Sequence, residues 1–191
     1  AVGLPIKINS VLMSGINDNQ ILPLARWSVQ QQIILRFIEF MPLDGDRKWL
    51  TEHVVSEQHI LETLATEFAV TTQVHDSAQA TSNPARQYLI NNHPIGIIST
   101  ITNSFCGTCD RVRLTAQGEF YNCLFAPQGL NLKAEIKALT SSEPLGEVSL
   151  NGALSSYIWN KEQGFHAIEQ RLNNQSLAKS SRKISMHMLG G

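Results

Sequence analysis

The sequence predicts an α/β fold, and two observations support that prediction. The first is a strand, a helix and a second strand within the first 41 residues, which form a βαβ unit and imply a parallel sheet. The second is a later series of short strands and helices without internal repeats, typical of an α+β arrangement. With 42% hydrophobic residues among 191, the chain is long enough for one sizeable core or two smaller ones.

Hydrophobic periodicity predicts each element of the βαβ unit. Residues 5–11 alternate apolar and polar side chains, which predicts a strand. Residues 15–18 supply a turn and a helix N-cap, and the apolar residues from Ile21 to Val29 share one helical face. Residues 33–41 are apolar at both parities, as expected for a strand covered on both faces. The first strand would be an unprotected apolar edge, so we expect the chain to be the C-terminal portion of something larger.

The elements after residue 43 are shorter and more polar. After a segment rich in Asp, Gly and Lys, residues 56–68 predict a helix capped by Ser56, and residues 71–83 predict a surface connection. Strands are predicted at residues 87–90, 96–101, 111–115 and 119–125, and helices around residues 130–139 and 147–172. Gly118 is expected in a hairpin turn between the last two strands, at a position with positive φ.

Charge and hydropathy exclude several classes of partner. The net charge is −1 with acidic and basic residues interleaved, which gives no footprint for nucleic acid or an anionic membrane. The longest apolar runs are far too short to span a bilayer, and the N-terminus has no charged leader. We therefore expect a soluble, cytoplasmic protein.

The three cysteines of the chain, Cys106, Cys109 and Cys123, lie close together in the sequence. An odd number of clustered cysteines argues against a disulfide framework and favours ligation or redox chemistry. Cys106 and Cys109 have the Cys-x-x-Cys spacing at which two thiolates reach one metal from a tight loop. A hairpin would bring Cys123, on its return strand, to the same end. The alternative is three small buried hydrophobic side chains.

Zinc and an iron–sulfur cluster are the metal centres to compare. A structural zinc ion takes four protein ligands, so His93, His166 or His187 would have to complete the site, and none has the spacing of a zinc motif. A 4Fe–4S cluster accepts three cysteines and leaves one iron open to water or substrate. The spacing therefore favours an oxygen-sensitive 4Fe–4S cluster and leaves zinc open.

Two arginines follow the cysteine loop. Arg111 and Arg113 alternate with Val112 and Leu114 on a predicted strand, so both arginines point to one face. Two guanidinium groups at this spacing suit a phosphate or a carboxylate. A solvated strand face fits the same pattern, but the neighbouring cysteines favour a phosphorylated substrate.

Several motifs resemble one protein family. Residues 105–115 (Phe-Cys-Gly-Thr-Cys-Asp-Arg-Val-Arg-Leu-Thr), followed by Gly118 and residues 123–125 (Cys-Leu-Phe), resemble the GTP 3′,8-cyclase (MoaA) family of molybdenum cofactor biosynthesis. These are radical S-adenosylmethionine enzymes. Further stretches resemble landmarks of the family in the same order: residues 7–9, 15–18, 36–42, 84–86 and 190–191.

The resemblance implies a fold and a reaction. Residues 1–50 would be the C-terminal part of an incomplete, TIM-like radical barrel, and residues 51–191 a C-terminal 4Fe–4S and GTP-binding domain with a double-glycine tail. In this family a first cluster cleaves S-adenosylmethionine, and the resulting radical starts the cyclisation of GTP to (8S)-3′,8-cyclo-7,8-dihydroguanosine 5′-triphosphate. The enzyme class is a lyase. A partner enzyme, cyclic pyranopterin monophosphate synthase, acts on the product.

The resemblance also implies roles by position. Cys106, Cys109 and Cys123 would bind the second 4Fe–4S cluster; Lys7, Arg36, Arg111, Val112 and Arg113 would contact GTP; Met41 would contact S-adenosylmethionine; Gly190 and Gly191 would reach into the active-site cavity. Lys7 also fits an exposed edge charge. Arg36 also fits an ion-pair partner of Glu39 or Asp44.

The chain departs from the family pattern in three respects. The Cys-x-x-x-Cys-x-x-Cys motif of the first cluster is missing together with the N-terminal half of the barrel, so we expect this chain alone not to cleave S-adenosylmethionine. Asp110 stands where the family usually has Asn, and Asn83 where Gly often precedes Pro-Ala-Arg. Other functions stay open: a peptide-modifying radical maturase, a zinc-stabilised binding module and, from the Gly-Gly end, a ubiquitin-like sulfur carrier. A homodimer is also left open.

Overall fold

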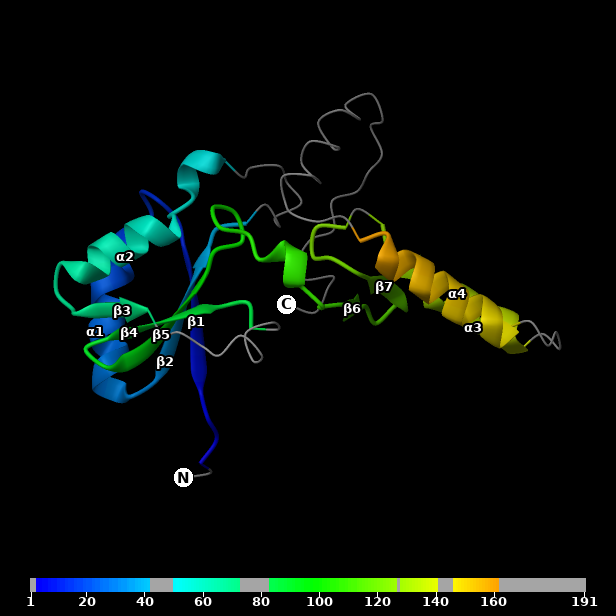
Figure 1. Ribbon diagram of the computed structural model, residues 1–191, viewed down its shortest axis with the longest axis horizontal. Helices are drawn as coiled ribbons and strands as arrows, with labels where there is room; N and C mark the ends of the chain where they lie inside the picture. Colours follow the sequence, from blue (N-terminus) through cyan, green and yellow to red (C-terminus); the bar gives the residue numbers. More distant parts are fainter. Residues whose placement is uncertain (1–2, 42–49, 73–82, 127, 141–145, 162–191) are drawn as a thin grey trace. The chain divides into compact units, whose positions relative to one another are not determined.

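The chain forms two compact units in a computed structural model that describes residues 3–41, 50–72, 83–126, 128–140 and 146–161 (Figure 1). The first unit comprises residues 1–42 and 48–109, and the second comprises residues 43–47 and 110–191. Helices and strands occur in both units, so the predicted α/β class is confirmed at that level. The predicted division at residue 50 stays a prediction.

A five-stranded mixed sheet forms the centre of the first unit, with strand order β1-β2-β5-β4-β3. The strands are β1 (Lys7–Leu12), β2 (Ile34–Glu39), β3 (Val70–Thr72), β4 (Arg86–Ile90) and β5 (His93–Ile98). β1 and β2 are parallel, and β2 and β5 are parallel, whereas β3, β4 and β5 pair antiparallel. The predicted βαβ unit is therefore confirmed, and β1 lies at an edge of the sheet.

Helices α1 (Ile21–Gln31) and α2 (Glu57–Ala65) pack on one face of this sheet and close the core (Figure 1). Ser56 caps α2 as predicted, because its side chain accepts a hydrogen bond from the backbone N–H of His59. The expected cap of α1 is wrong. A 3-10 turn (Asp18–Gln20) precedes α1, and the Asn17 side chain accepts from the N–H of Met13 at 2.7 Å instead.

Alternate residues of β2 separate the two faces of the sheet. Leu35 and Phe37 are fully buried under the helices, whereas Ile34 and Ile38 on the other face are half-buried. In the part of the chain that the structure describes, β2 is thus completely covered on one face only. We call the other face the helix-free face.

The hairpin between β4 and β5 turns at Asn91 and Asn92, whose φ angles are 47° and 67°. Two positive φ angles match the twist of a two-residue hairpin, and asparagine tolerates them. β5 ends at Ile98, so the predicted strand to residue 101 is too long. The hydrogen-bonding groups that follow Ile98 bind two carboxylates rather than a neighbouring strand.

The second unit contains a three-stranded antiparallel sheet, order β6-β7-β8, and two helices. Its elements are β6 (Arg113–Leu114), β7 (Glu119–Tyr121), β8 (Leu130–Asn131), α3 (Leu132–Thr140) and α4 (Gly146–Trp159). Gly118 has φ +87° in the hairpin between β6 and β7, as predicted. Both strands are shorter than predicted. The predicted helix over residues 147–172 is represented by α4, which ends at Trp159, and residues 162–172 lie outside the described residues. None of the described helices is long and apolar enough to cross a membrane.

Candidate functional site

The carboxyl ends of β2 and β5 lie side by side, because these strands are neighbouring and parallel. β2 ends at Glu39, two residues before Met41, and β5 leads through residues 99–105 to Cys106. In barrels built from parallel strands, residues at this edge of the sheet form the active site. The fold thus places the S-adenosylmethionine candidate Met41 and the first cysteines after adjacent strand ends of one unit.

Cys106 and Cys109 lie in one tight turn. Residues Cys106–Thr108 form a 3-10 helix, and the N–H of Cys109 donates to the carbonyl of Cys106 at 3.3 Å. The side chain of Ser104 accepts from the N–H of Cys106 at 3.3 Å. Both thiols are free of disulfides and half-buried, as suits ligands that must be reached by a metal.

Cys123 does not lie on the return strand of the hairpin, which corrects the prediction. β7 ends at Tyr121, and the side chain of buried Asn122 donates to the carbonyl of Tyr157 in α4 at 2.6 Å. This bond draws the chain away from the sheet, so Cys123 lies in the following bend. Its sulfur accepts from the N–H of Phe125 at 3.5 Å, and the half-buried thiol takes part in no disulfide.

The side chains of Cys106, Cys109 and Cys123 are of the chemical type that binds an iron–sulfur cluster. Cys106 and Cys109 belong to the first unit and Cys123 to the second. Among the described residues, no three His, Cys, Asp or Glu side chains form a group that could hold a metal ion. The three cysteines are half-buried and take part in no disulfide, and cysteine thiolates are the ligands that an open 4Fe–4S cluster uses.

His93 does not suit a zinc site with Cys106 and Cys109. It begins β5, whereas the cysteines follow the opposite end of that strand, and six strand residues span roughly 16 Å. Its ring nitrogen Nε2 is 3.1 Å from the carbonyl of Ile33, and the residue is buried. His166 and His187 lie outside the described residues.

Arg111 and Arg113 alternate in exposure with their neighbours. Both arginines are half-buried, whereas Val112 and Leu114 are 49% and 61% exposed. The alternation agrees with the expectation that the two guanidinium groups share a face. Arg113 begins β6, in register with Tyr121, and Arg111 precedes the strand.

Lys7 and Arg36 both lie on the helix-free face of the first sheet. Arg36 is in register with Asn9 on one side and with Gly96 on the other, and Lys7 begins β1 at the end of the sheet opposite Met41. A Cβ atom on Gly96 would lie only 3.1 Å from Cγ of Arg36, so the glycine leaves room for the arginine stem.

An ion pair between Arg36 and Glu39 is excluded because the two side chains leave β2 on opposite faces. Glu39 is fully buried on the helix-covered face, where backbone N–H groups and Thr102 bind its carboxylate. Asp44, the other suggested partner, and the glycines Gly190 and Gly191 lie outside the described residues.

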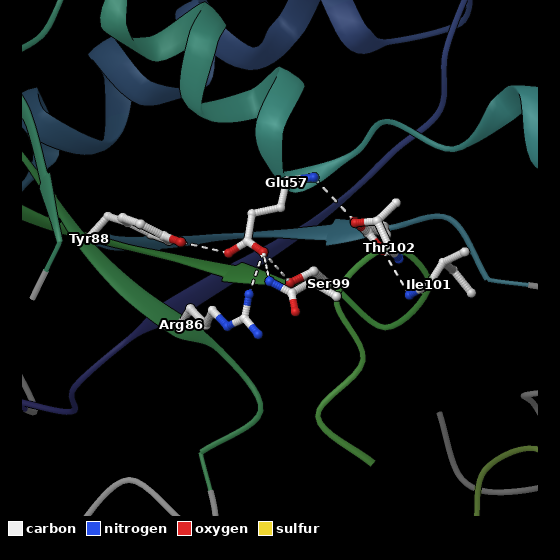
Figure 2. Close-up of polar contacts among 8 residues, drawn as sticks. Glu57, Arg86, Tyr88, Ser99, Ile101 and Thr102 are labelled. Carbon is white, nitrogen blue, oxygen red and sulfur yellow. Dashed lines mark hydrogen bonds and ion pairs between the residues drawn. The ribbon is translucent and has the colours of Figure 1, made fainter. Parts of the chain in front are cut away.

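Two buried carboxylates, Glu39 and Glu57, are a feature that sequence reasoning missed. Figure 2 shows Glu57 with Tyr88 and Arg86. Glu57 accepts from Tyr88 at 2.7 Å and from Arg86 at 2.8 Å, and Arg86 also forms an ion pair with it. Burial, and then the hydrogen bond to Glu57, raises the pKa of Tyr88 to about 12, so its hydroxyl donates at neutral pH. An acid inside the apolar run of residues 33–41 was the only sign in the sequence.

Comparison of the sequence with known proteins assigns the chain to a family. Residues 33–167 match the family described as Molybdenum Cofactor Synthesis C. The chain belongs to this family. The resemblance drawn from the motifs is thereby confirmed, since the matched region contains all three cysteines and both arginines.

Three proteins that are similar to this chain are each named GTP 3′,8-cyclase. The chain is 40% identical to that of Streptomyces coelicolor over 84% of its length and 46% of the relative. It is 37% identical to that of Rhodococcus opacus, over 98% of the chain and 49% of the relative. It is 30% identical to that of Staphylococcus carnosus, over all of the chain and 54% of the relative. The chain therefore spans about half the length of these relatives.

Proposed function

We propose that this chain supplies the substrate-binding half of a GTP 3′,8-cyclase in molybdenum cofactor biosynthesis, with Cys106, Cys109 and Cys123 holding a 4Fe–4S cluster. The observation that supports this most strongly is the Cys106–Cys109 turn on the segment that follows β5, the parallel neighbour of β2, in a chain whose relatives bear that name. A cluster bound by three cysteines supplies one open iron that can bind a substrate atom.

Positively charged side chains of the chain would bind GTP. Arg111 and Arg113 bind phosphate oxygens through their planar guanidinium groups, with the backbone at Val112 between them. Arg36 and Lys7 add positive charge on the helix-free face, which would be the inside of a barrel. Because triphosphate carries several negative charges, each cation that contacts it lowers the cost of bringing it out of water.

Met41 would contact S-adenosylmethionine, and Gly190 and Gly191 would enter the active-site cavity. Residues without Cβ fit a narrow cavity in backbone conformations closed to other residues. Radical generation needs S-adenosylmethionine and the first 4Fe–4S cluster, whose three-cysteine motif does not occur in these 191 residues. We therefore propose that the activity requires an N-terminal half of the barrel that supplies this motif, and that the product passes to cyclic pyranopterin monophosphate synthase.

Anaerobic reconstitution tests the cluster directly. The chain should take up about four irons with a broad visible absorption that bleaches in air, and replacing any one cysteine by Ala should remove that absorption. Ser155→Ala, an exposed change in α4, is the control and should retain it. Stoichiometric zinc without iron uptake would favour the zinc-stabilised binding module and overturn the proposal.

A further inference from the structure

Residues 99–103, which follow β5, are attached to the rest of the first unit by the carboxylates of Glu39 and Glu57. We call these two carboxylates the carboxylate clamp, and Figure 2 shows Glu57 with Ser99. Glu39 accepts from the backbone N–H groups of Ile101 at 2.8 Å and Thr102 at 2.9 Å, and from the Thr102 hydroxyl. Glu57 accepts from the side chains of Ser99 at 2.9 Å and Asn103 at 3.1 Å.

The clamp is also joined to the rigid frame of the unit. Glu39 projects from β2 and accepts from the N–H of Glu57, in the first turn of α2, at 3.2 Å. An N–H group there has no partner within its own helix, and the helix dipole favours a negative charge at that end. Glu57 accepts from Tyr88 and Arg86 of β4. The clamp therefore connects β2, β4 and the start of α2 to one irregular segment.

Residues 99–105 include no helix or strand, so their backbone groups need other partners. Ser99, Thr100 and Ile101 are buried, where an unpaired N–H group is costly. A carboxylate only accepts hydrogen bonds, and each clamp residue faces several donors. Apolar packing is not directional and would not by itself fix the path of this segment. Hydrogen bonds are directional, so bonds to two fixed carboxylates define that path.

We propose that Glu39 and Glu57 are positioning residues, which fix residues 99–103 and thereby the direction in which the turn presents the thiols of Cys106 and Cys109. This inference rests on the proposed function, because a fixed direction of the thiols is needed only if they bind a cluster. The contacts themselves lie wholly within the first unit.

The experiment removes single donors to the clamp and measures thiol reactivity in the reduced, metal-free chain. Ser99→Ala and Thr102→Val each remove one hydroxyl donor on the segment side, from Glu57 and Glu39 respectively. Tyr88→Phe removes one donor to Glu57 on the frame side and is the matched control. Alkylation by iodoacetamide is followed at each cysteine by mass spectrometry, and Cys123 in the second unit is the internal reference.

Segment-side variants should raise the alkylation rates of Cys106 and Cys109 relative to Cys123 by about fivefold, the change that the loss of one net hydrogen bond produces in an opening equilibrium. Hydrogen exchange at the amides of Ile101 and Thr102 should rise with them. Tyr88→Phe should leave the thiol ratio unchanged even if it lowers the melting temperature. Asn103→Ala, an exposed change, replaces either segment-side variant that fails to fold.

Reconstitution of the same variants separates the two proposals. Segment-side variants should lose iron to a chelator several times faster than the parent chain, and Tyr88→Phe should not. Unchanged thiol ratios and amide exchange in Ser99→Ala, Thr102→Val and Asn103→Ala would overturn the clamp, whatever the iron content. A parent chain that takes up no iron would overturn the proposed function, and the thiol ratios would still decide whether the clamp orders the turn.

Discussion

Gly96→Ala tests whether the helix-free face is built around Arg36. A methyl group at Gly96 would lie 3.1 Å from Cγ of Arg36 and 3.2 Å from Cβ of Ala85, closer than the 3.4–4 Å of ordinary contacts. Gly96 has no positive φ, so the backbone itself accepts alanine and the effect is steric. Either the arginine stem or the segment at Ala85 must move.

The magnitude follows from two opposing contributions. Overpacking by one methyl group costs about 1–3 kcal/mol, whereas the lower entropy of the unfolded chain returns about 0.5–1 kcal/mol. We expect the free energy of unfolding to fall by about 1 kcal/mol. GTP affinity should fall as well, because Arg36 is displaced from the position proposed for it.

Urea denaturation followed by circular dichroism measures the stability, and calorimetry measures GTP binding. Gly152→Ala in α4 is the matched control, since nothing lies within 4 Å of its added methyl group. It should stabilise the chain by up to about 1 kcal/mol, the difference in helix propensity. In an Arg36→Ala background the closest contact is gone, so Gly96→Ala should cost less than in the parent. Equal costs in both backgrounds would refute the reasoning.

Two further predictions concern the arginines of the second unit and Tyr88. Arg111→Ala or Arg113→Ala should weaken GTP binding about tenfold or more, and Lys at either position should restore it only in part. Leu114→Ala, a change at the neighbouring exposed residue, should leave GTP affinity unchanged. If both arginine variants bind GTP like the parent and retain their iron, the proposed site is wrong. Because burial raises the pKa of Tyr88 to about 12, its contribution to stability is complete below pH 10 and is lost as the pH rises from 10 to 12. Melting temperatures should therefore fall more steeply over that range in the parent than in Tyr88→Phe, and parallel curves would show that Tyr88 contributes nothing.

Elements that depend on interactions between residues close in sequence could be predicted from the sequence. The βαβ unit follows from periodicity, Ser56 caps α2, and Gly118 adopts the positive φ that its hairpin needs. In each case the decisive interaction lies within a few residues of the pattern, so the sequence itself contains the information. The spacing of Cys106 and Cys109 is local in the same way, and the structure places both in one turn.

Interactions between distant residues decided the rest. Glu39 binds Ile101 and Thr102, 62 and 63 positions away, and Glu57 binds Ser99, 42 positions away. Apart from its place in an apolar run, nothing near Glu39 identifies its partners, because most of them are backbone N–H groups that every residue except proline has. Likewise, the bond from Asn122 to Tyr157 takes Cys123 off the strand that its own neighbours predict. The sequence thus determined the local elements and the spacing of the candidate site residues. Tertiary hydrogen bonding between distant segments decided where β5 ends and which contacts hold the segment before the cysteine turn.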